Sequence, residues 1–263
     1  MLSGSETLAL VIRSGVAKLQ KTHLEKFLLG FLAGAFIGLG FFADLKVTAV
    51  FPKEFAGLAS FLGAAVFPMG LIAVVIVGAE LLTGNFMTVT VSLLDRKVKV
   101  GPTIINFIEI AIYNVIGAVA TAFLLTHLTG MVNTTPDNLA YHTKLLAMAA
   151  SKVAASPSVA FFSAIGCNWL VGLSIWQYIA GKDTMGKIIG AWFPIMVFVA
   201  IGFQHSVANS FLIPAAIFAG APITWGQFFA NFGIVALGNL VGAALFVSVF
   251  HYYGFRKGLP KEE

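Results

Sequence analysis

The most constraining feature of the sequence is a run from Ile188 to Phe255 that contains no Asp, Glu, Lys or Arg. Of the 263 residues, 59% are hydrophobic and only 10% are charged, whereas a soluble domain has about 25% charged residues. Long uncharged segments suit the bilayer, where one helical span needs about 20 apolar residues. The chain is too long for one or two spans and has no polar block as large as a soluble domain. We therefore predict an all-α, multi-pass membrane protein with one membrane domain.

The apolar segments define six spans, of which the second and the fifth are interrupted. The second is followed, after Glu80, by a shorter apolar piece at 81–94, and the fifth is followed by one at 210–219. The order span, broken span, span therefore occurs twice, and two three-span repeats must be inverted relative to each other. The predicted spans are about 27–43, 55–79, 104–128, 158–180, 188–202 and 226–250.

The two interruptions lie at matching places in the two repeats and read 80-ELLTGN-85 and 204-QHSVAN-209. Each begins with a carboxylate or an amide and ends with a small residue followed by Asn. Broken helices at matching places in two repeats indicate a binding site near the bilayer midplane. Non-helical backbone at that depth is tolerated only inside protein or beside a water-filled cavity.

The basic residues predict the orientation of the chain. Twelve of the sixteen Lys and Arg residues fall in segments on the side of the N-terminus, which the positive-inside rule places in the cytoplasm. We predict an amphipathic helix on the inner membrane surface within residues 1–26, a channel domain at 27–252 and a cytoplasmic tail at 253–263. The basic residues form no cluster, so nucleic acid is not an expected partner.

Two polar side chains in the interruptions are candidates for the centre of a pore. Burial in apolar surroundings favours the neutral form of His205, and a neutral ring still offers one N–H donor. Thr83, in the other interruption, is its expected partner across the repeat. The alternative is that His205 only satisfies the backbone of the broken helix. The remaining residues of the breaks are assigned structural roles. Glu80 is expected to accept freed backbone N–H groups, Gly84 to leave room for the turn, and Asn85, Gln204 and Asn209 to support the breaks.

Lys152 precedes the fourth span and has two possible roles. A lysine at a span edge can extend to the lipid head groups, or it can point into an outer vestibule and attract anions. Asn168, further along the same helix, is positioned to form hydrogen bonds on its inner face. Apolar rings on both sides of the polar centre would exclude hydrated ions. The outer candidates are Phe67, Leu71 and Phe198, and the inner ones are Leu81, Leu82 and Val171.

Three segments resemble the signature segments of the formate–nitrite transporter family: 78-GAELLTGNFM-87, 166-GCNWLVGLSIW-176 and 202-GFQHSVANSFLIP-214. The resemblance implies an aquaporin-like protomer in the plasma membrane and a homopentamer with one pore per protomer. It also implies transport of small monovalent anions such as formate, nitrite and hydrosulfide, often with a proton. The family's central histidine and threonine fall on His205 and Thr83, and its vestibule lysine falls on Lys152.

The resemblance also assigns the supporting residues of the anion path. Its asparagines fall on Asn168 and, within 237-LGNLVGA-243, on Asn239, so we expect both beside Lys152. Its constrictions fall on Phe67, Leu71 and Phe198 outside and on Leu81 and Leu82 inside. Many formate members have Glu at the position of Gln204, which favours a structural role for this residue.

Other functions fit the sequence less well. An aquaporin would carry Asn-Pro-Ala at both interruptions, and an ammonium channel would need two mid-membrane histidines. A membrane enzyme would need a metal or nucleophile cluster, and neither the lone Cys167 nor the scattered histidines form one, so no metal or other cofactor is expected. We predict a formate channel, with nitrite or hydrosulfide as the alternative substrate.

Overall fold

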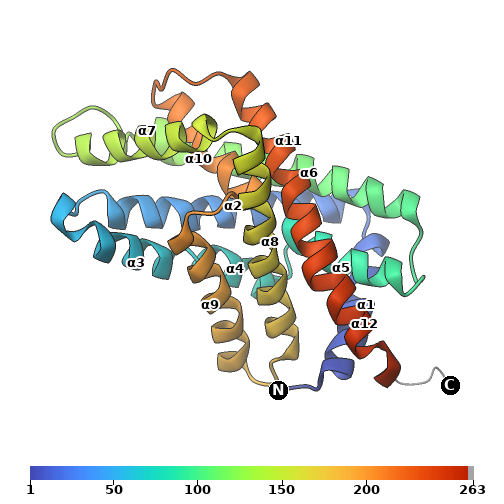
Figure 1. Cartoon of the computed structure of the whole chain (residues 1–263). Coiled ribbons are helices and arrows are strands. Elements are labelled where there is room, and N and C mark those ends of the chain that lie inside the picture. The colour runs from blue at the N-terminus through green and yellow to red at the C-terminus, as the bar shows by residue number, and fades with distance from the viewer. Residues whose placement is uncertain (260–263) are drawn as a thin grey trace.

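A computed structural model describes residues 1–259, and every regular element in this range is helical (Figure 1). Residues 260–263, which end the predicted tail, lie outside the described part. The elements are α1 Gly4–Gln20, α2 His23–Thr48, η1 Lys53–Phe55, α3 Ala56–Val66, α4 Met69–Val77, α5 Leu82–Leu94, α6 Val100–Ala122, η2 Phe123–Leu128, α7 Leu139–Ala154, α8 Pro157–Ala180, α9 Thr184–Ile201, α10 Ser206–Phe218, α11 Trp225–Val241, η3 Gly242–Val249, α12 Phe250–Phe255 and η4 Arg256–Gly258.

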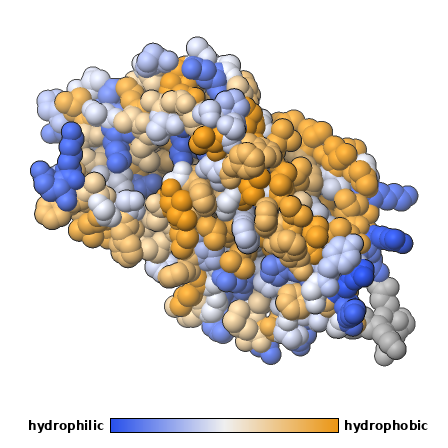
Figure 2. Space-filling view, in the orientation of Figure 1, coloured by the Kyte–Doolittle hydropathy of each residue, from blue (hydrophilic) through white to orange (hydrophobic). Residues whose placement is uncertain are grey.

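Six helical stretches are long and apolar enough to cross a membrane, which confirms the predicted fold class. Leu82–Leu94 and Ser206–Phe218 are shorter apolar helices that follow the second and fifth stretches, as predicted for the broken spans. A broad band of apolar residues covers the molecule between two more hydrophilic ends (Figure 2). The six stretches are His23–Thr48, Lys53–Val77, Val100–Leu128, Pro157–Ala180, Thr184–Ile201 and Trp225–Gly258.

Each broken span turns at a glycine in the left-handed region. Gly78 ends α4 with φ 77° and Gly202 ends α9 with φ 82°, a conformation that costs glycine little. The sequence analysis gave the turn at the first break to Gly84, and this assignment is wrong. Gly84 is helical within α5, and an added Cβ there would lie 3.6 Å from Ile175.

The two repeats are each held by a close helix crossing. An added Cβ at Gly34 of α2 would lie 2.1 Å from the Asn114 carbonyl oxygen of α6, and one at Gly242 would lie 2.3 Å from the Ile165 carbonyl oxygen of α8. Only glycine allows this approach of backbones, which is the packing that small-residue spacing predicts in membranes. The crossings of α2 with α6 and of α8 with α11 and η3 are equivalent in the two inverted repeats.

The N-terminal helix differs from its predicted position. The apolar face of α1, with Leu8 and Val11 fully buried, packs on α5 and the bundle instead of being presented to lipid. Ser92 of α5 donates a hydrogen bond to the Ile12 carbonyl at 2.8 Å, and an added Cβ at Gly15 would lie 2.1 Å from its Oγ. The helix is therefore part of the folded bundle.

The predicted boundaries at both ends of the channel domain also shift. α2 begins at His23, capped by Thr22, and the helix at the C-terminal end continues through Phe255 into η4. The N-terminus and α12 lie in the lower part of Figure 1, and α7 lies at the opposite end. The first span also extends to Thr48, five residues past its predicted end, and so includes Asp44.

Candidate functional site

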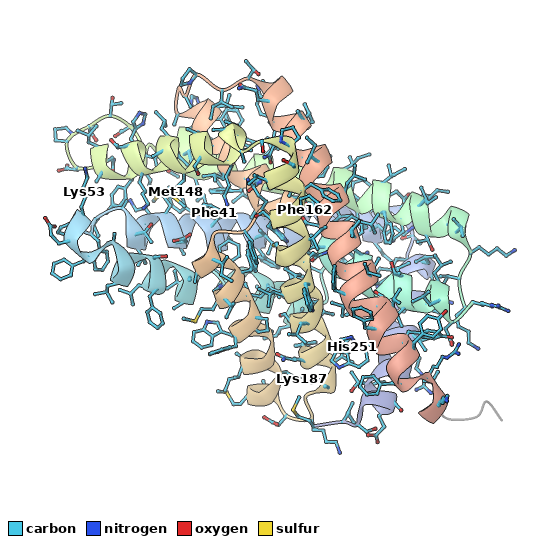
Figure 3. The ribbon with its side chains drawn as sticks, viewed as in Figure 1. Phe41, Lys53, Met148, Phe162, Lys187 and His251 are labelled. Atoms are coloured by element: carbon cyan, nitrogen blue, oxygen red, sulfur yellow. The ribbon has the colours of Figure 1, made fainter. Side chains whose placement is uncertain are left out.

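Two cavities approach the helix breaks from opposite ends of the molecule. The first, of about 100 Å³, is here called the Lys152 vestibule; at roughly 30 Å³ per water it holds about three molecules. Figure 3 labels Met148 of α7 and Phe41 of α2, which both line this cavity. It is lined by Phe41, Asp44, Phe67, Met148, Lys152, Phe198, Val199, Gly202, Phe203, His205, Ala208 and Asn209.

The second cavity, of about 220 Å³, is here called the Lys18 vestibule. It lies where α1 packs against the first break, and equivalent positions of the two repeats line the two cavities. Lys18 here corresponds to Lys152, and Leu81 corresponds to His205. It is lined by Ser14, Ala17, Lys18, Lys21, Val74, Val75, Gly78, Ala79, Glu80, Leu81, Gly84, Asn85, Thr88, Ile175, Tyr178 and Ile179.

Between the vestibules, His205 and Thr83 form a hydrogen bond, with 3.0 Å between Nε2 and Oγ1. The other ring nitrogen, Nδ1, accepts the backbone N–H of Ala208 at 3.0 Å and so caps α10. Because Nδ1 is an acceptor, the proton of the neutral ring is on Nε2 and is donated to the Thr83 hydroxyl. The hydroxyl proton of Thr83 is then free for another partner. The predicted pairing across the repeat is thus present.

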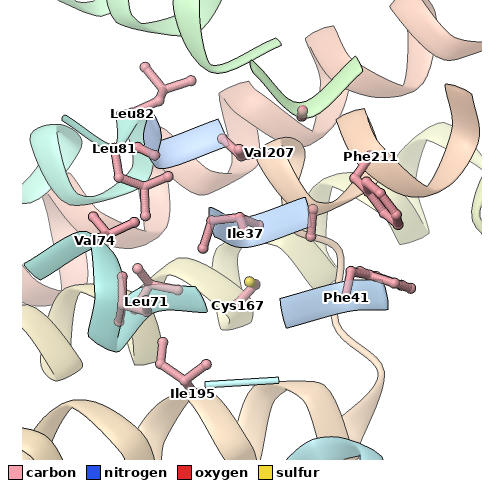
Figure 4. Close-up of a cluster of buried hydrophobic side chains, with 14 of the residues drawn as sticks. Ile37, Phe41, Leu71, Val74, Leu81, Leu82, Cys167, Ile195, Val207 and Phe211 are labelled. Atoms are coloured by element: carbon pink, nitrogen blue, oxygen red, sulfur yellow. The ribbon is translucent and has the colours of Figure 1, made fainter. Parts of the chain in front are cut away.

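Aromatic rings cover the histidine on the side of the Lys152 vestibule. The Phe198 ring stacks on His205 with 5.7 Å between centroids, and its centroid is 5.7 Å from that of Phe67. Figure 4 shows Leu71, Leu81 and Leu82 in the buried apolar cluster around this centre. Of the predicted constriction residues, Phe67, Phe198 and Leu81 line a vestibule. Leu71, Leu82 and Val171 line neither. The constriction itself remains a prediction.

An asparagine of α6 holds the first break. Asn114 Oδ1 accepts the backbone N–H of Leu82 at 2.8 Å, and its Nδ2 donates to the carbonyls of Gly30 and Glu80, both at 2.8 Å. All three bonds satisfy backbone groups that the interrupted helix and its neighbour leave free, as buried polar groups require.

Asn239 holds the second break by the same three bonds. Its Oδ1 accepts the backbone N–H of Ser206 at 3.0 Å, and its Nδ2 donates to the carbonyls of Ala164 at 2.8 Å and Gln204 at 3.2 Å. The fully buried amide has no free donor for an anion. Asn239 is therefore a structural residue at the break, whereas we expected it beside Lys152.

Asn168 is also displaced from its expected place. Its Nδ2 donates to the carbonyls of Thr83 at 3.2 Å and Asn239 at 2.7 Å. It therefore connects the backbone of Thr83 in the first repeat to α11 in the second repeat. Its Oδ1 is buried and has no hydrogen-bond partner in the described structure. The residue thus lies at the centre of the molecule and not in the Lys152 vestibule.

Glu80 and Gln204 occupy equivalent positions but have different partners. Glu80 forms ion pairs with Lys18 at 3.0 Å and Lys21 at 3.4 Å and accepts the Asn85 amide at 2.9 Å. Its expected role as acceptor of freed backbone N–H groups is wrong, because Asn114 performs that role. Gln204 Oε1 accepts the Asn209 amide at 2.7 Å, which is the counterpart of the Asn85–Glu80 bond in the first break.

The Lys152 side chain turns toward the second break and not toward the lipid head groups. Its Nζ donates to the carbonyls of Gly202 at 2.9 Å and Phe203 at 3.1 Å. Burial lowers the pKa of this ammonium from its ordinary value. The structure therefore favours the vestibule position over the alternative at the membrane surface.

Known proteins resemble this chain in sequence and fold. The family described as formate/nitrite transporter matches residues 5–253. The chain is 42% identical to the formate channel BtFdhC of Bacillus thuringiensis over 248 residues, which is 94% of this chain and 93% of that protein. The chain belongs to the formate/nitrite transporter family. It is also 48% identical to the uncharacterized transporter YrhG of Bacillus subtilis strain 168 over 246 residues, with 94% and 91% of the two chains covered.

A solved structure has the same fold as this formate/nitrite transporter. It is described as a pentameric formate channel with formate bound, is 26% identical, and superposes with a TM-score of 0.77 over 89% of this chain and 98% of that one. Within residues 1–259, no group of three or more His, Cys, Asp or Glu side chains is placed to hold a metal ion.

Several residues that line the Lys152 vestibule were not predicted from the sequence of this family member, among them Phe41, Asp44 and Met148. Phe41 and Met148 have no signal that separates them from ordinary core residues. Asp44 has such a signal, because it directly follows the apolar run 27–43, but the predicted span ends at residue 43 and so excludes it. An acidic residue inside a span is a functional candidate.

Proposed function

We propose that this chain conducts small monovalent anions, with formate as its substrate and a proton moving with it. The observation that carries the proposal is the Thr83–His205 pair between two vestibules, one of which contains the half-buried Lys152. Relatives named as formate channels support the substrate.

The proposed path has three steps. Lys152 concentrates the anion in its vestibule, because a cation in a narrow, low-dielectric opening raises the local anion concentration. The basicity of the anion then rises as it leaves water, since desolvation disfavours the charged form. It passes the apolar rings at Phe67 and Phe198 as the neutral acid or while bonded to the pore centre. An uncompensated charge at the bilayer centre would cost about 3 kcal/mol or more.

The direct test is uptake of labelled formate into proteoliposomes that contain the purified protein, with nitrite and hydrosulfide as competitors. We expect saturable formate uptake that acid stimulates. Uptake of nitrite or hydrosulfide without formate would reassign the substrate, and no uptake of any of the three would reject the proposal. The absence of chemical conversion of formate would further exclude the enzyme alternative.

Replacing Lys152 with Ala should weaken uptake most at low formate concentration. The change removes the vestibule cation, so we expect the rate of uptake at low formate concentration to fall by about tenfold or more. The rate at saturating formate should fall less. Lys53→Ala is the matched control, because Lys53 is an exposed lysine at the same end of the molecule. Equal uptake by wild type and Lys152→Ala at every concentration would contradict the role of Lys152.

We also propose a homopentamer in the plasma membrane with one pore per protomer and both termini in the cytoplasm. The apolar window of α9 is only 22% buried within one chain, and Ile189 and Phe193 are exposed, so this helix has an apolar face that lipid or another protomer must cover. The likeness to a pentameric channel favours protomer contacts. Native mass spectrometry in detergent should show five subunits, and a stable monomer or tetramer would contradict this assembly.

A further inference from the structure

Asp44 contributes a buried carboxylate to the Lys152 vestibule. The residue is 6% exposed, lies on α2 near the end of the span, and lines the cavity together with Lys152 and His205. Its carboxylate rests over Gly63 of α3, where an added Cβ would lie 2.0 Å from Oδ1. The carboxylate forms no hydrogen bond and no direct ion pair within residues 1–259, whereas the Asp44 backbone carbonyl accepts the Thr48 hydroxyl at 2.8 Å.

The Lys18 vestibule shows why this lack of a partner is unusual. There, the break residue Glu80 directly neutralises Lys18 at 3.0 Å. In the Lys152 vestibule the equivalent break residue is Gln204, which is uncharged, and Lys152 is bonded only to backbone carbonyls. The acid of this vestibule therefore comes from α2 and not from the break.

Few other charges act on Asp44. α7 contributes Lys152 and Lys144, both of which interact electrostatically with the carboxylate, and the second break contributes His205. The parts of α3 and α9 that face the site are uncharged, with Gly63 from α3 and Phe198 and Val199 from α9. The charge of the vestibule is thus set mainly by Lys152 and Asp44.

The protonation state of Asp44 changes what an approaching anion meets. When Asp44 is ionised, its charge opposes that of Lys152 and repels an anion from the same small cavity. When Asp44 is protonated, the charge of Lys152 is unopposed, and the carboxyl can donate an O–H hydrogen bond to the anion. Acid would therefore turn the cavity from a poor anion site into a good one.

We propose that Asp44 is a proton-binding residue of the Lys152 vestibule, and that its protonation admits the anion. This inference rests on the proposed function as an anion channel. It places a proton-binding site in the vestibule, before the pore centre. Acid then favours binding of the anion in the vestibule through Asp44 and passage of the anion through the pore centre at His205.

The test is the variant Asp44→Asn, which keeps the shape of the side chain but cannot ionise. We expect the KM for formate near pH 7, the pH at which a surface carboxylate is ionised, to fall by roughly tenfold, toward the value that wild type shows in acid. The KM of the variant should then change little with pH, while the maximal rate stays close to that of wild type. Glu54→Gln, at an exposed carboxylate at the same end of the molecule, should keep the wild-type KM profile.

Further variants keep the inference testable. Asp44→Glu retains the acid and should retain a pH-dependent KM, and Asp44→Ser gives the same expectation as Asn if the Asn variant does not assemble. A KM profile in the folded neutral variant that equals that of wild type, or a KM that rises near pH 7, would overturn the role of Asp44. Wild-type protein that takes up no formate would instead reject the proposed function.

Discussion

Replacing His205 with Asn should leave the protein folded and assembled but lower acid-stimulated formate uptake by roughly 100-fold, the low end of what a positioned proton donor contributes. The structure makes this substitution selective. Nδ1 of His205 caps α10 by accepting the Ala208 N–H, and Asn is one of the best N-cap residues. Asn can therefore replace the structural bond, but its amide does not titrate, so only a proton role is lost.

Thr83→Val should impair the same step. It removes the hydroxyl that accepts the hydrogen bond from His205 Nε2, and it keeps the side-chain volume nearly constant. Thr121→Val is the matched control. Thr121 is a buried threonine of α6 whose hydroxyl bonds only to the Gly117 carbonyl of its own helix, and it lines neither vestibule. Uptake by this control should be close to that of wild type.

Both variants and the wild type are measured by formate uptake into proteoliposomes at a series of pH values between about pH 5 and about pH 8. A slow downhill leak of formate can remain in His205→Asn, since the path itself stays open. If the Asn variant has the pH dependence of wild type, His205 is only a structural cap of α10, and its proposed role in proton transfer is rejected. Acid stimulation that survives in His205→Asn but is lost in Asp44→Asn would assign the acid response to the vestibule alone.

The architecture was predictable because it depends on hydrophobicity along the chain. Each span is an uncharged run, and each break is a short polar interruption in such a run. Both are therefore visible in the sequence without knowledge of distant contacts. The turns at Gly78 and Gly202 were predictable for the same reason, since each glycine lies two residues before the polar interruption of its span. Our choice of Gly84 was wrong because a glycine inside a helix and a glycine in a turn look alike in sequence.

The partners within the site were less predictable, because they depend on contacts between segments far apart in the chain. Glu80 meets Lys18 only because α1 folds onto the bundle, and our prediction had placed α1 on the membrane surface. Asn239 meets Ser206 only because α11 crosses behind the second break. His205 and Thr83 were paired correctly because the inverted repeat alone brings the two breaks together.

Replacing Asn239 with Ala should greatly destabilise the second break and abolish uptake together with it. The change removes one acceptor and two donors, which leaves the Ser206 N–H and the carbonyls of Ala164 and Gln204 without this partner in the protein interior. Each unsatisfied buried group costs about 1–3 kcal/mol, so the loss is on the order of several kcal/mol. We expect a clearly lower thermal midpoint in detergent and faster amide hydrogen exchange at the start of α10.

The equivalent change in the first repeat provides the comparison that tests this prediction. Asn114→Ala removes the same three bonds at the first break and should lower the thermal midpoint by a similar amount, with faster exchange at the start of α5 instead. Asn138→Ala is the control for loss of an asparagine amide, because its partners lie in an exposed connector and water can replace it. If Asn239→Ala keeps the wild-type midpoint but loses uptake, Asn239 acts directly on the anion path and not through the fold of the break.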